Sequence, residues 1–479
     1  MRLKEVIEKL EIIKTAGNID VQVSTVCWHT SLLADDCIFV ARRGNTYDPF
    51  EHIGDIAGRA ACIVTDRECD CFPDSMCMLM VKDIQEASEL LSDMFFGSFD
   101  GMRLIGVTGT NGKTSVVSMI AHILKISGKR TGVMGTIDYS WPGSVIESFM
   151  TTPDKYNLRT ILHNMFRAGC EYAVFEVSSH ALELGRLNGL LLDFSVYTNL
   201  TPEHLDFHHD IESYARAKNK IHSLLKPGGK ALINADDRYS AASAGNRNIK
   251  VLSSGVENRA DYYVKNYDVG RKGIFLSIGH NDEETNIYSP LRGSFNVYNL
   301  LSAFAVAHSA GIDVQHIKSA LECFNGVPGR MEMAADDVFV DYAHTSDALE
   351  KVLKALLDLG YAGIITVFGC GGMRDRSKRC LMGRIAEQLS SRVIITDDNP
   401  RQEDPDIIFD DIRTGLSREH IFMHDRKEAI FKALSLKEQG YAVLIAGKGH
   451  ENYQLIGREK RPFSDRAIVQ EYYDKNNFR

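Results

Sequence analysis

The feature that most constrains the fold is an alternation of apolar, strand-like runs with helical segments from Arg103 onward. The first such runs are LIGVTG (104–109), YAVFEVSSH (172–180), DFSVYTNLT (193–201) and KALINADD (230–237). VFVDYAH (338–344), GIITVFGCGG (363–372), RVIITDDNP (392–400) and YAVLIAGKGHE (441–451) follow them. This alternation is typical of α/β proteins, in which helices cover the faces of a mostly parallel sheet.

The length of 479 residues suggests about three domains. Short β-rich runs and one helical stretch precede the linker SFDGM (98–102), and NGVPGR (325–330) places Gly and Pro where a helical pattern cannot continue. We therefore predict a small N-terminal domain over residues 1–98, a central domain over 99–328 and a doubly wound C-terminal domain over 329–479.

The composition excludes several classes of binding partner. Lys and Arg total 55 against 64 Asp and Glu, and no basic patch is visible, so we expect no nucleic acid partner. No apolar run approaches the roughly 20 residues that span a bilayer, and the N-terminus does not read as a signal peptide. We expect a cytoplasmic monomer that does not bind membranes and whose ten dispersed cysteines stay reduced.

The segment GVTGTNGKTS (106–115) has the context of a phosphate-binding loop, because a strand precedes it and a helical run follows. Gly109 and Gly112 allow backbone N–H groups to turn toward phosphate oxygens, Lys113 supplies a charge, and Thr114 or Ser115 can ligate Mg²⁺. The strict GxxxxGK[ST] spacing is not met, since Val107 stands at its first glycine position.

Two further motifs follow predicted strands. Glu176 ends one strand and could hold a magnesium ion, although a hydrogen-bonded strand end is the simpler interpretation of this residue alone. The segment NLTPEHLDFHHDIESYARAKNKIH (199–222) adds His204 and neighbouring acidic and histidine residues. A phosphate loop favours Mg²⁺ over zinc here, and spacing alone places Lys218 on a solvated helix face.

In the C-terminal third of the chain, acidic and basic residues follow three of the predicted strands. Arg374 and Arg401 are planar forks suited to carboxylates, and Asp398, Asn399 and Glu451 could hold an ammonium group. This combination suits a zwitterionic amino acid, whereas a surface ion-pair network is the alternative. No GxSxG elbow is present, so covalent acyl-enzyme chemistry is not supported and phosphoryl transfer is favoured.

In order along the chain, TGTNGKT, TTP, EVSSHAL, NLTPEHLDFH, ARAK, GSFNVYN, PGRME, DYAHT, FGCGG, DNPR and GKGHE resemble the Mur ligase family, and its diaminopimelate-adding members in particular. The resemblance implies a nucleotide-sugar domain, a central P-loop ATPase domain and a Rossmann-like C-terminal domain. It also implies ATP and Mg²⁺ as cofactors, with UDP-MurNAc-L-Ala-D-Glu and meso-diaminopimelate as substrates. The reaction would form an amide through an acyl phosphate in peptidoglycan precursor synthesis.

The same resemblance assigns roles to single residues. It implies Mg²⁺ ligation by Thr114, Glu176, His204 and a carbamylated Lys218, which replaces the solvated interpretation of that lysine. The ATP residues are Gly109, Thr110, Asn111, Gly112, Lys113, Thr114, Ser115, Asn299, Arg330, Asp341 and His344. The muramoyl-dipeptide residues are Thr151, Thr152, Ser178 and Arg186, and those for diaminopimelate are Arg374, Asp398, Asn399, Pro400, Arg401, Gly447 and Glu451.

The chain departs from the family pattern at several points. His29, Thr30 and Ser31 stand where members usually carry a DSR-type uridine motif, and Met373 replaces an acidic residue. Cys380 and Ser346 each replace a proline. These departures leave open a Mur-like ligase for another carboxylate or amino acid, such as L-lysine, and a P-loop protein that binds ATP without ligating.

Overall fold

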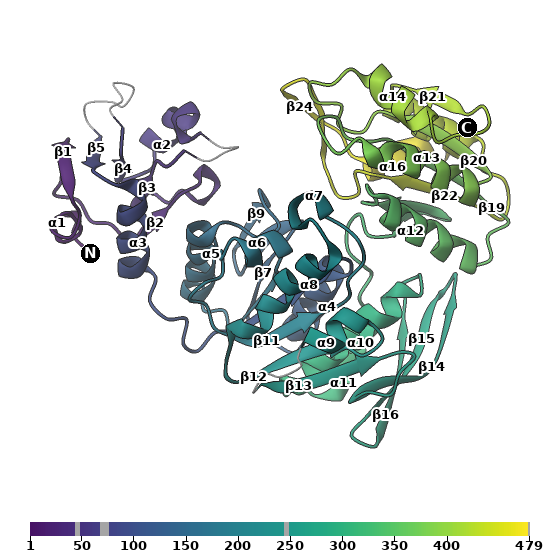
Figure 1. Ribbon diagram of the computed structural model, residues 1–479, viewed down its shortest axis with the longest axis horizontal. Coiled ribbons are helices and arrows are strands. Elements are labelled where there is room, and N and C mark those ends of the chain that lie inside the picture. The colour runs from purple at the N-terminus through teal and green to yellow at the C-terminus, as the bar shows by residue number, and fades with distance from the viewer. Residues whose placement is uncertain (44–47, 68–75, 244–248, 478–479) are drawn as a thin grey trace. The chain divides into compact units, whose positions relative to one another are not determined.

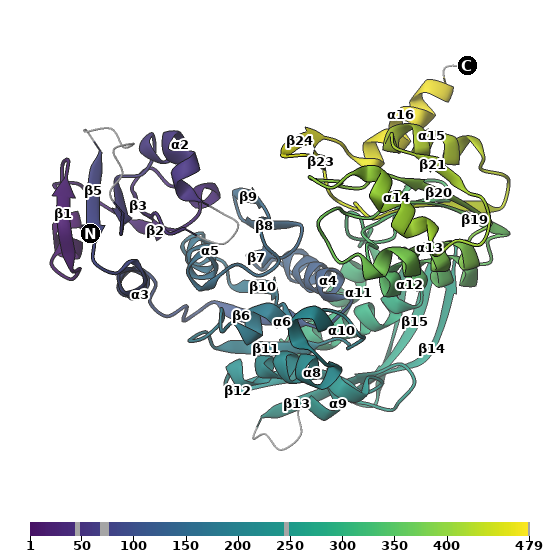
Figure 2. The same ribbon diagram turned by 45° about the horizontal axis from the view of Figure 1, so that its top comes forward.

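The computed structural model describes residues 1–43, 48–67, 76–243 and 249–477 and divides into two compact units. The first comprises Met1–Asp261 and Ser302–His316, and the second comprises Tyr262–Leu301 and Ile317–Arg479. Figures 1 and 2 show the elements of each unit in two views. Within the described residues, no helix is both long and apolar enough to cross a membrane.

The first part of unit 1 is a five-stranded sheet of order β1-β5-β4-β3-β2, in which only β1 runs antiparallel to its neighbour. Its longest helix, α3, is capped by Asp83, whose side chain accepts from the backbone N–H groups of Gln85 and Glu86. The elements are α1 (Leu3–Ile7), β1 (Ile12–Ala16), β2 (Thr25–Cys27), η1 (Thr30–Leu32), β3 (Cys37–Val40), η2 (Pro49–His52), α2 (Ile53–Ala57), β4 (Cys62–Thr65), β5 (Cys77–Val81) and α3 (Ile84–Phe95).

The rest of unit 1 forms a sheet of order β13-β12-β11-β6-β10-β7-β8-β9, parallel from β13 to β7. The parallel strands are β6 (Arg103–Thr108), β7 (Thr131–Met134), β10 (Tyr172–Glu176), β11 (Leu192–Tyr197), β12 (Leu225–Asn234) and β13 (Lys250–Gly255). The antiparallel pair is β8 (Asp138–Trp141) and β9 (Ser144–Glu147). The helices are α4 (Lys113–Ile126), α5 (Lys155–Arg167), α6 (Ser179–Glu183), α7 (Leu205–His208), α8 (Ile211–Asn219), η3 (Lys220–Leu224) and α9 (Arg238–Ser243).

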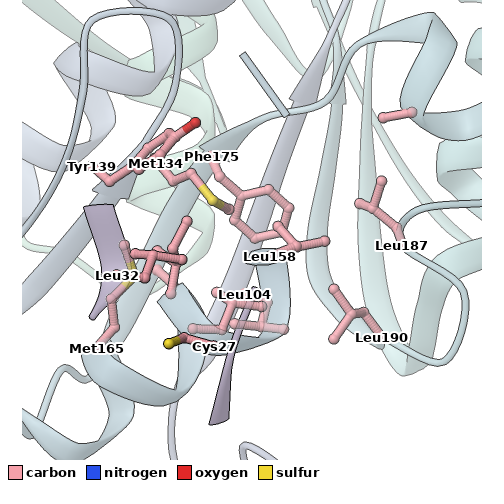
Figure 3. Close-up of a cluster of buried hydrophobic side chains, with 14 of the residues drawn as sticks. Cys27, Leu32, Leu104, Met134, Tyr139, Leu158, Met165, Phe175, Leu187 and Leu190 are labelled. Carbon is pink, nitrogen blue, oxygen red and sulfur yellow. The ribbon is translucent and has the colours of Figure 1, made fainter. Parts of the chain in front are cut away.

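A buried apolar cluster joins the N-terminal sheet to this larger sheet. It contains Cys27 and Leu32 from the first sheet's side together with Leu158 and Met165 from α5, and Figure 3 shows these side chains. Trp28 also stacks on Tyr156 of α5, with ring centroids 4.9 Å apart. Burial of this much apolar surface fixes the N-terminal sheet against α5.

Unit 2 contains an antiparallel ribbon of β14 (Tyr262–Gly270), β15 (Gly273–His280) and β16 (Glu283–Ser289), which the sequence analysis did not predict. The β15–β16 turn places Asn281 and Asp282 at positive φ, as a two-residue hairpin turn requires. Helix α10 (Phe295–Ser309) runs from unit 2 into unit 1, and α11 (Val314–Glu322) follows it.

The remaining sheet of unit 2 has the order β17-β18-β22-β19-β20-β21, and all of it except β17 is parallel. Phe339 of β18 packs in a cluster with α12, α13 and α14, whereas Val338 and Val340 of the same strand pack in a cluster with α15 and α16. Helices thus cover both faces, as predicted for a doubly wound domain.

The elements of this sheet are β17 (Glu332–Ala335), β18 (Val338–Asp341), α12 (Ser346–Asp358), β19 (Gly363–Phe368), α13 (Ser377–Leu389), β20 (Arg392–Thr396), α14 (Pro405–Arg413), β21 (Ile421–Met423), α15 (Arg426–Ser435), β22 (Tyr441–Ala446) and α16 (Asp465–Asn477). A separate hairpin consists of β23 (Tyr453–Ile456) and β24 (Glu459–Pro462). The α/β class is therefore confirmed, while the limits predicted for three domains stay predictions.

Candidate functional site

The loop between β6 and α4 has the backbone geometry of an anion site. Gly109 and Gly112 lie at φ +148° and +84°, which a residue with a side chain rarely adopts. A Cβ on Gly109 would lie 1.9 Å from Thr198 Oγ1, so a side chain has no room there. Because α4 begins at Lys113, its unpaired N–H groups face this loop and favour a phosphate.

The segment after β11 holds the loop in place. Asn199 Oδ1 accepts from the Asn111 N–H at 3.0 Å, and Thr198 Oγ1 donates to the Asn111 carbonyl at 2.6 Å. Thr110 Oγ1 donates to the Thr201 carbonyl at 3.2 Å. Thr198, which the sequence motifs did not single out, thus both bonds to this loop and fills the space beside Gly109.

Two lysines converge on one carbonyl oxygen. Lys113 Nζ and Lys218 Nζ each donate to the Gly109 carbonyl at 2.8 Å. Lys218 is 1% exposed, and its Nζ lies 4.5 Å from the ring centroid of Tyr214. The solvated helix face that spacing favoured for Lys218 is therefore wrong. Tyr214 and Ala217 are buried on the same helix, so Lys218 occupies a core-facing position of α8.

Burial sets the chemistry of Lys218. It lowers the pKa of this amine well below its usual value, and the nearby charge of Lys113 acts in the same direction. Over the part of the chain that the structure describes, no carboxylate lies within 4.0 Å of Lys218 Nζ to restore the charged form. The neutral form of the amine is therefore favoured, and a neutral amine is nucleophilic because its lone pair is free.

Glu176 is held by hydrogen bonds at the end of β10. It is 1% exposed, and its carboxylate accepts from the Thr136 N–H at 2.8 Å and the Thr136 hydroxyl at 3.2 Å. The Val177 N–H donates to the Val107 carbonyl at 2.8 Å, so this strand end lies beside the one that leads into the phosphate loop. Glu176 is thus a hydrogen-bonded strand end, which was the simpler of the two interpretations of its sequence. It also lies at the edge of the sheet where α/β proteins bind ligands.

His204 belongs to a group of aromatic rings near α7. It adopts φ 56°, and its ring centroid lies 4.9 Å from that of His180 and 6.2 Å from that of Tyr214. Burial lowers the pKa of His204, which favours the neutral imidazole that can bind a metal. No group of three His, Cys, Asp or Glu side chains suited to a metal occurs among the described residues.

The four residues predicted for the muramoyl-dipeptide lie close together beside Glu176. Thr152 Oγ1 donates to the Glu176 carbonyl at 2.9 Å and accepts from the Ser178 N–H at 3.0 Å. Arg186 Nη1 donates to the Thr152 carbonyl at 2.7 Å, and the Thr151 hydroxyl lies 3.1 Å from that of Thr136. The backbone thus brings together residues that are up to 35 positions apart in the sequence, from Thr151 to Arg186.

The departure at residues 29–31 lies at the start of η1. His29 Nδ1 accepts from the Ser31 N–H at 3.2 Å, and its ring stacks on Phe149 with centroids 3.8 Å apart. Burial lowers the pKa of His29 to about 4. The uncharged ring therefore stacks on Phe149, which precedes Thr151 by two residues in the sequence.

Unit 2 brings together three of the four remaining residues predicted to line ATP. Asp341 is buried and accepts from the N–H groups of Met331 at 2.6 Å and Ala343 at 2.8 Å, and burial raises its pKa. The Arg330 guanidinium lies 4.9 Å from the ring centroid of Tyr342, whose carbonyl is 2.8 Å from His344 Nδ1. The fourth, Asn299 on α10, donates to Asn296 at 2.9 Å.

The predicted amino-acid pocket is built around a carboxylate at the end of β20. Asp398 is 8% exposed, and its Oδ2 is buried without a hydrogen-bond partner among the described residues. A Cβ on Gly447, at φ +116°, would lie 2.6 Å from this oxygen. A buried carboxylate oxygen without a partner is costly, so this oxygen is available to a hydrogen-bond donor that a ligand would supply.

Arg401 faces the same pocket in a left-handed conformation, φ 55°, directly after Pro400. Its N–H donates to the Leu455 carbonyl at 2.9 Å and its carbonyl accepts from the Gly457 N–H at 2.7 Å, so the β23–β24 hairpin fixes it. Its Nη1 donates to the Gly372 carbonyl at 3.0 Å. A Cβ on Gly371 would lie 2.8 Å from Arg401 Nη1 and 3.7 Å from Arg374 Cγ, which brings the two arginines to one loop.

Met373 does not disturb this arrangement. Its side chain is 66% exposed, and its N–H donates to Glu403 at 2.7 Å. Lys448 is fully buried and donates to Asn399 and Glu451. It lies in the AGKGHE motif, but no role was predicted for it. A lysine between two glycines at a strand end was the available signal.

The chain matches known families over most of its length. The Mur ligase middle domain matches residues 107–307, and the Mur ligase glutamate ligase domain matches residues 329–449. A UDP-N-acetylmuramoyl-L-alanyl-D-glutamate–2,6-diaminopimelate ligase from Clostridioides difficile is 36% identical over 99% of this chain and 100% of its own length.

Solved structures give the same picture. A structure of a UDP-N-acetylmuramoyl-L-alanyl-D-glutamate–2,6-diaminopimelate ligase is 34% identical, with a TM-score of 0.61 over 100% of this chain and 99% of that one. A MurF ligase from Thermotoga maritima in complex with ADP shares the fold at 18% identity, with a TM-score of 0.65 over 95% and 97% of the two chains. The chain belongs to the Mur ligase family, whose members are ATP-dependent amide ligases.

Proposed function

We propose that this protein adds meso-diaminopimelate to UDP-MurNAc-L-Ala-D-Glu in the cytoplasm, as a monomer, with ATP hydrolysed to ADP and phosphate. The names of its full-length relatives support the substrates. The observation that carries the proposal is the buried, unpaired Oδ2 of Asp398 close to the fixed guanidinium of Arg401. The three domains would be residues 1–98 for UDP, 99–328 for ATP and 329–479 for the amino acid.

ATP would bind over the loop from Gly109 to Ser115, with Asn299, Arg330, Asp341 and His344 lining the nucleotide. Lys113 would leave the Gly109 carbonyl to contact the terminal phosphates, because a polyphosphate is the stronger acceptor for its ammonium group. Magnesium, when bound, would neutralise the charge that moves between phosphates. Thr114, Glu176 and His204 supply the oxygen and imidazole donors that suit it.

Lys218 would complete this set after carbamylation. The neutral amine attacks the carbon of CO₂, a C–N bond forms, and the nitrogen loses a proton, which leaves a carbamate anion. Its lowered pKa and the absence of a paired carboxylate support this step. The modification places an anion beside Lys113, so the two side chains attract each other.

The dipeptide would lie along Thr151, Thr152, Ser178 and Arg186, with the γ-carboxylate of D-Glu at the phosphate loop. Attack of that carboxylate on the γ-phosphorus of ATP gives an acyl phosphate and ADP. The amine of diaminopimelate then attacks the acyl carbon, and the tetrahedral intermediate collapses as phosphate leaves. Lys113 compensates the charge in the first step.

In the second step, Asp398, Asn399 and Glu451 would orient the amino acid, with Arg374 and Gly447 completing the pocket. Arg401 would pair with the second carboxylate of meso-diaminopimelate, which L-lysine lacks. A fixed arginine fork suits such a pair, because two parallel N–H groups match the two carboxylate oxygens.

The test is phosphate release with product mass, measured on purified protein with ATP, Mg²⁺ and UDP-MurNAc-L-Ala-D-Glu. Meso-diaminopimelate and L-lysine are supplied in parallel. Turnover with diaminopimelate alone supports the proposal, and turnover with L-lysine alone contradicts the pocket assignment. No turnover with either favours another acceptor, or a protein that binds ATP without ligating.

A further inference from the structure

A fully buried lysine lies behind the amino-acid pocket. Lys448 follows β22 and has 0% exposure. Its Nζ donates to Glu451 Oε2 at 2.9 Å and to Asn399 Oδ1 at 3.1 Å. A buried ammonium group is tolerated only when it is paired and hydrogen-bonded, and these two residues supply a carboxylate and accept two of its three N–H donors.

The three side chains form a closed triangle. Asn399 Nδ2 donates to the same Glu451 Oε2 at 2.8 Å, while Asn399 Oδ1 also accepts from the Leu455 N–H at 2.8 Å. Both donors therefore converge on one carboxylate oxygen of Glu451. Its other oxygen, Oε1, makes no hydrogen bond within the described ranges.

The two acids therefore differ in whether a direct partner compensates their negative charge. Glu451 has the Lys448 ammonium as a buried partner, whereas Asp398 has no ion pair and no hydrogen bond to Oδ2 in the described part of the chain. Lys378 and Arg426 act on the Asp398 charge only through longer-range electrostatics, so a ligand's ammonium gains most from the acid whose oxygen has no direct partner among the described residues. Glu451 Oε1 then serves as an oriented second acceptor.

We propose that Lys448 is a positioning residue for the amino-acid substrate. It orients Glu451 and Asn399 and reserves Asp398 as the main cation acceptor, without touching the substrate itself. The inference rests on the proposed function, because it takes this pocket as the amino-acid site.

The experiment compares Lys448→Met with wild type in steady-state kinetics, and it determines KM separately for diaminopimelate, ATP and the muramoyl-dipeptide. Methionine retains the length of the side chain but lacks the charge and the donors. We expect KM for diaminopimelate to rise about tenfold or more, because Glu451 and Asn399 lose the partner that orients them toward the substrate. KM for the other two substrates should change less than twofold.

The matched control is Lys427→Met. It removes a partly exposed lysine of α15 that pairs with Glu471 of α16 at 2.8 Å. It should leave all three constants unchanged. Equal increases in all three KM values for Lys448→Met, with a lowered Tm, would indicate a purely structural role and overturn the inference. So would an unchanged KM for diaminopimelate.

Two further arms keep the outcome decisive. Because Lys448 acts through Glu451, adding Lys448→Met to a Glu451→Gln protein should raise KM for diaminopimelate less than twofold further. An additive loss contradicts the inference. If Lys448→Met does not fold, Lys448→Gln, which removes the charge but keeps a donor, takes its place with the same expected direction. A wild-type protein that turns over no amino acid overturns the proposed function and this inference together, whereas an active wild type with an unaffected variant overturns the inference alone.

Discussion

Lys218 in unit 1 and Lys448 in unit 2 are both buried, at 1% and 0% exposure, but their partners differ. Lys218 donates to the Gly109 carbonyl and has the cation Lys113 beside it. Lys448 donates to the carboxylate of Glu451. Burial alone therefore does not assign a role to a lysine: Lys218 has a cation beside it, which favours the neutral amine, whereas Lys448 forms an ion pair with Glu451.

The largest effect should come from the phosphate loop, where Lys113 and Lys218 both donate to the Gly109 carbonyl. Lys113→Met removes the charge that compensates phosphoryl transfer, and we expect kcat to fall about 10³-fold. Phosphate release measures it. Lys125→Met on the exposed side of the same helix is the control and should remain active. A fall of less than tenfold for Lys113→Met would mean that this cation does not act in the reaction.

The second effect tests whether Lys218 works as an anion. Lys218→Ala should lower kcat about 10²-fold, since it deletes a ligand of the phosphate-bound metal. Added acetate or formate should restore part of the rate, because a small carboxylate can occupy the vacated space. Lys220→Ala, which removes an exposed partner of Glu183, should behave like wild type. Rescue by methylammonium instead of acetate would contradict the assignment.

The third effect concerns Arg401 in the predicted amino-acid pocket. Arg401→Ala should raise KM for diaminopimelate about 10²-fold, the cost of a bidentate carboxylate contact, and reduce the preference over L-lysine. Competition between the two amino acids, read by product mass, measures this preference. Arg461→Ala in β24 removes an exposed arginine paired with Glu459 and should leave the preference unchanged. An undiminished preference in Arg401→Ala would place the second carboxylate elsewhere.

The smallest effect is a pH dependence of the loop that carries Arg374. Hydrogen bonds from the buried Arg379 hold the pKa of Glu403 at about 2, and Glu403 in turn accepts from the Met373 N–H. A lowered carboxyl pKa gives stability that is complete above its usual value and is lost as the pH falls toward 2.

We expect this carboxylate to contribute about 1–2 kcal/mol less to the free energy of unfolding at pH 3 than at pH 6. Urea denaturation at both pH values measures it, with Glu403→Gln as the comparison. The variant should lose less stability than wild type over this interval. An equal loss in both proteins would show that other groups cause the pH dependence.

The sequence predicted much of the sheet architecture, because a buried parallel strand must be an apolar run and its ligand edge must be polar. Glu176 and Asp398 were found in this way. The β14–β16 ribbon was missed, because most of β14 is exposed or partly exposed and β16 alternates between buried and exposed residues, so neither strand is a continuous apolar run.

The roles that depend on long-range contacts could not be read from the chain. Lys218 has an ordinary helical spacing, and only the burial of α8 against the phosphate loop reveals its environment. Lys448 likewise depends on Asn399, 49 residues earlier in the sequence. Such pairs are set by which strand ends meet, which local patterns do not specify.

The most direct test of the contrast between the two lysines is carbon-13 NMR of the protein in labelled bicarbonate. A carbamate gives a carbonyl signal, and its assignment follows from loss of the signal in one variant. We predict one such signal that disappears in Lys218→Ala and persists in Lys448→Met. A signal retained in Lys218→Ala, or no signal in wild type, would contradict the different roles given to these two buried amines.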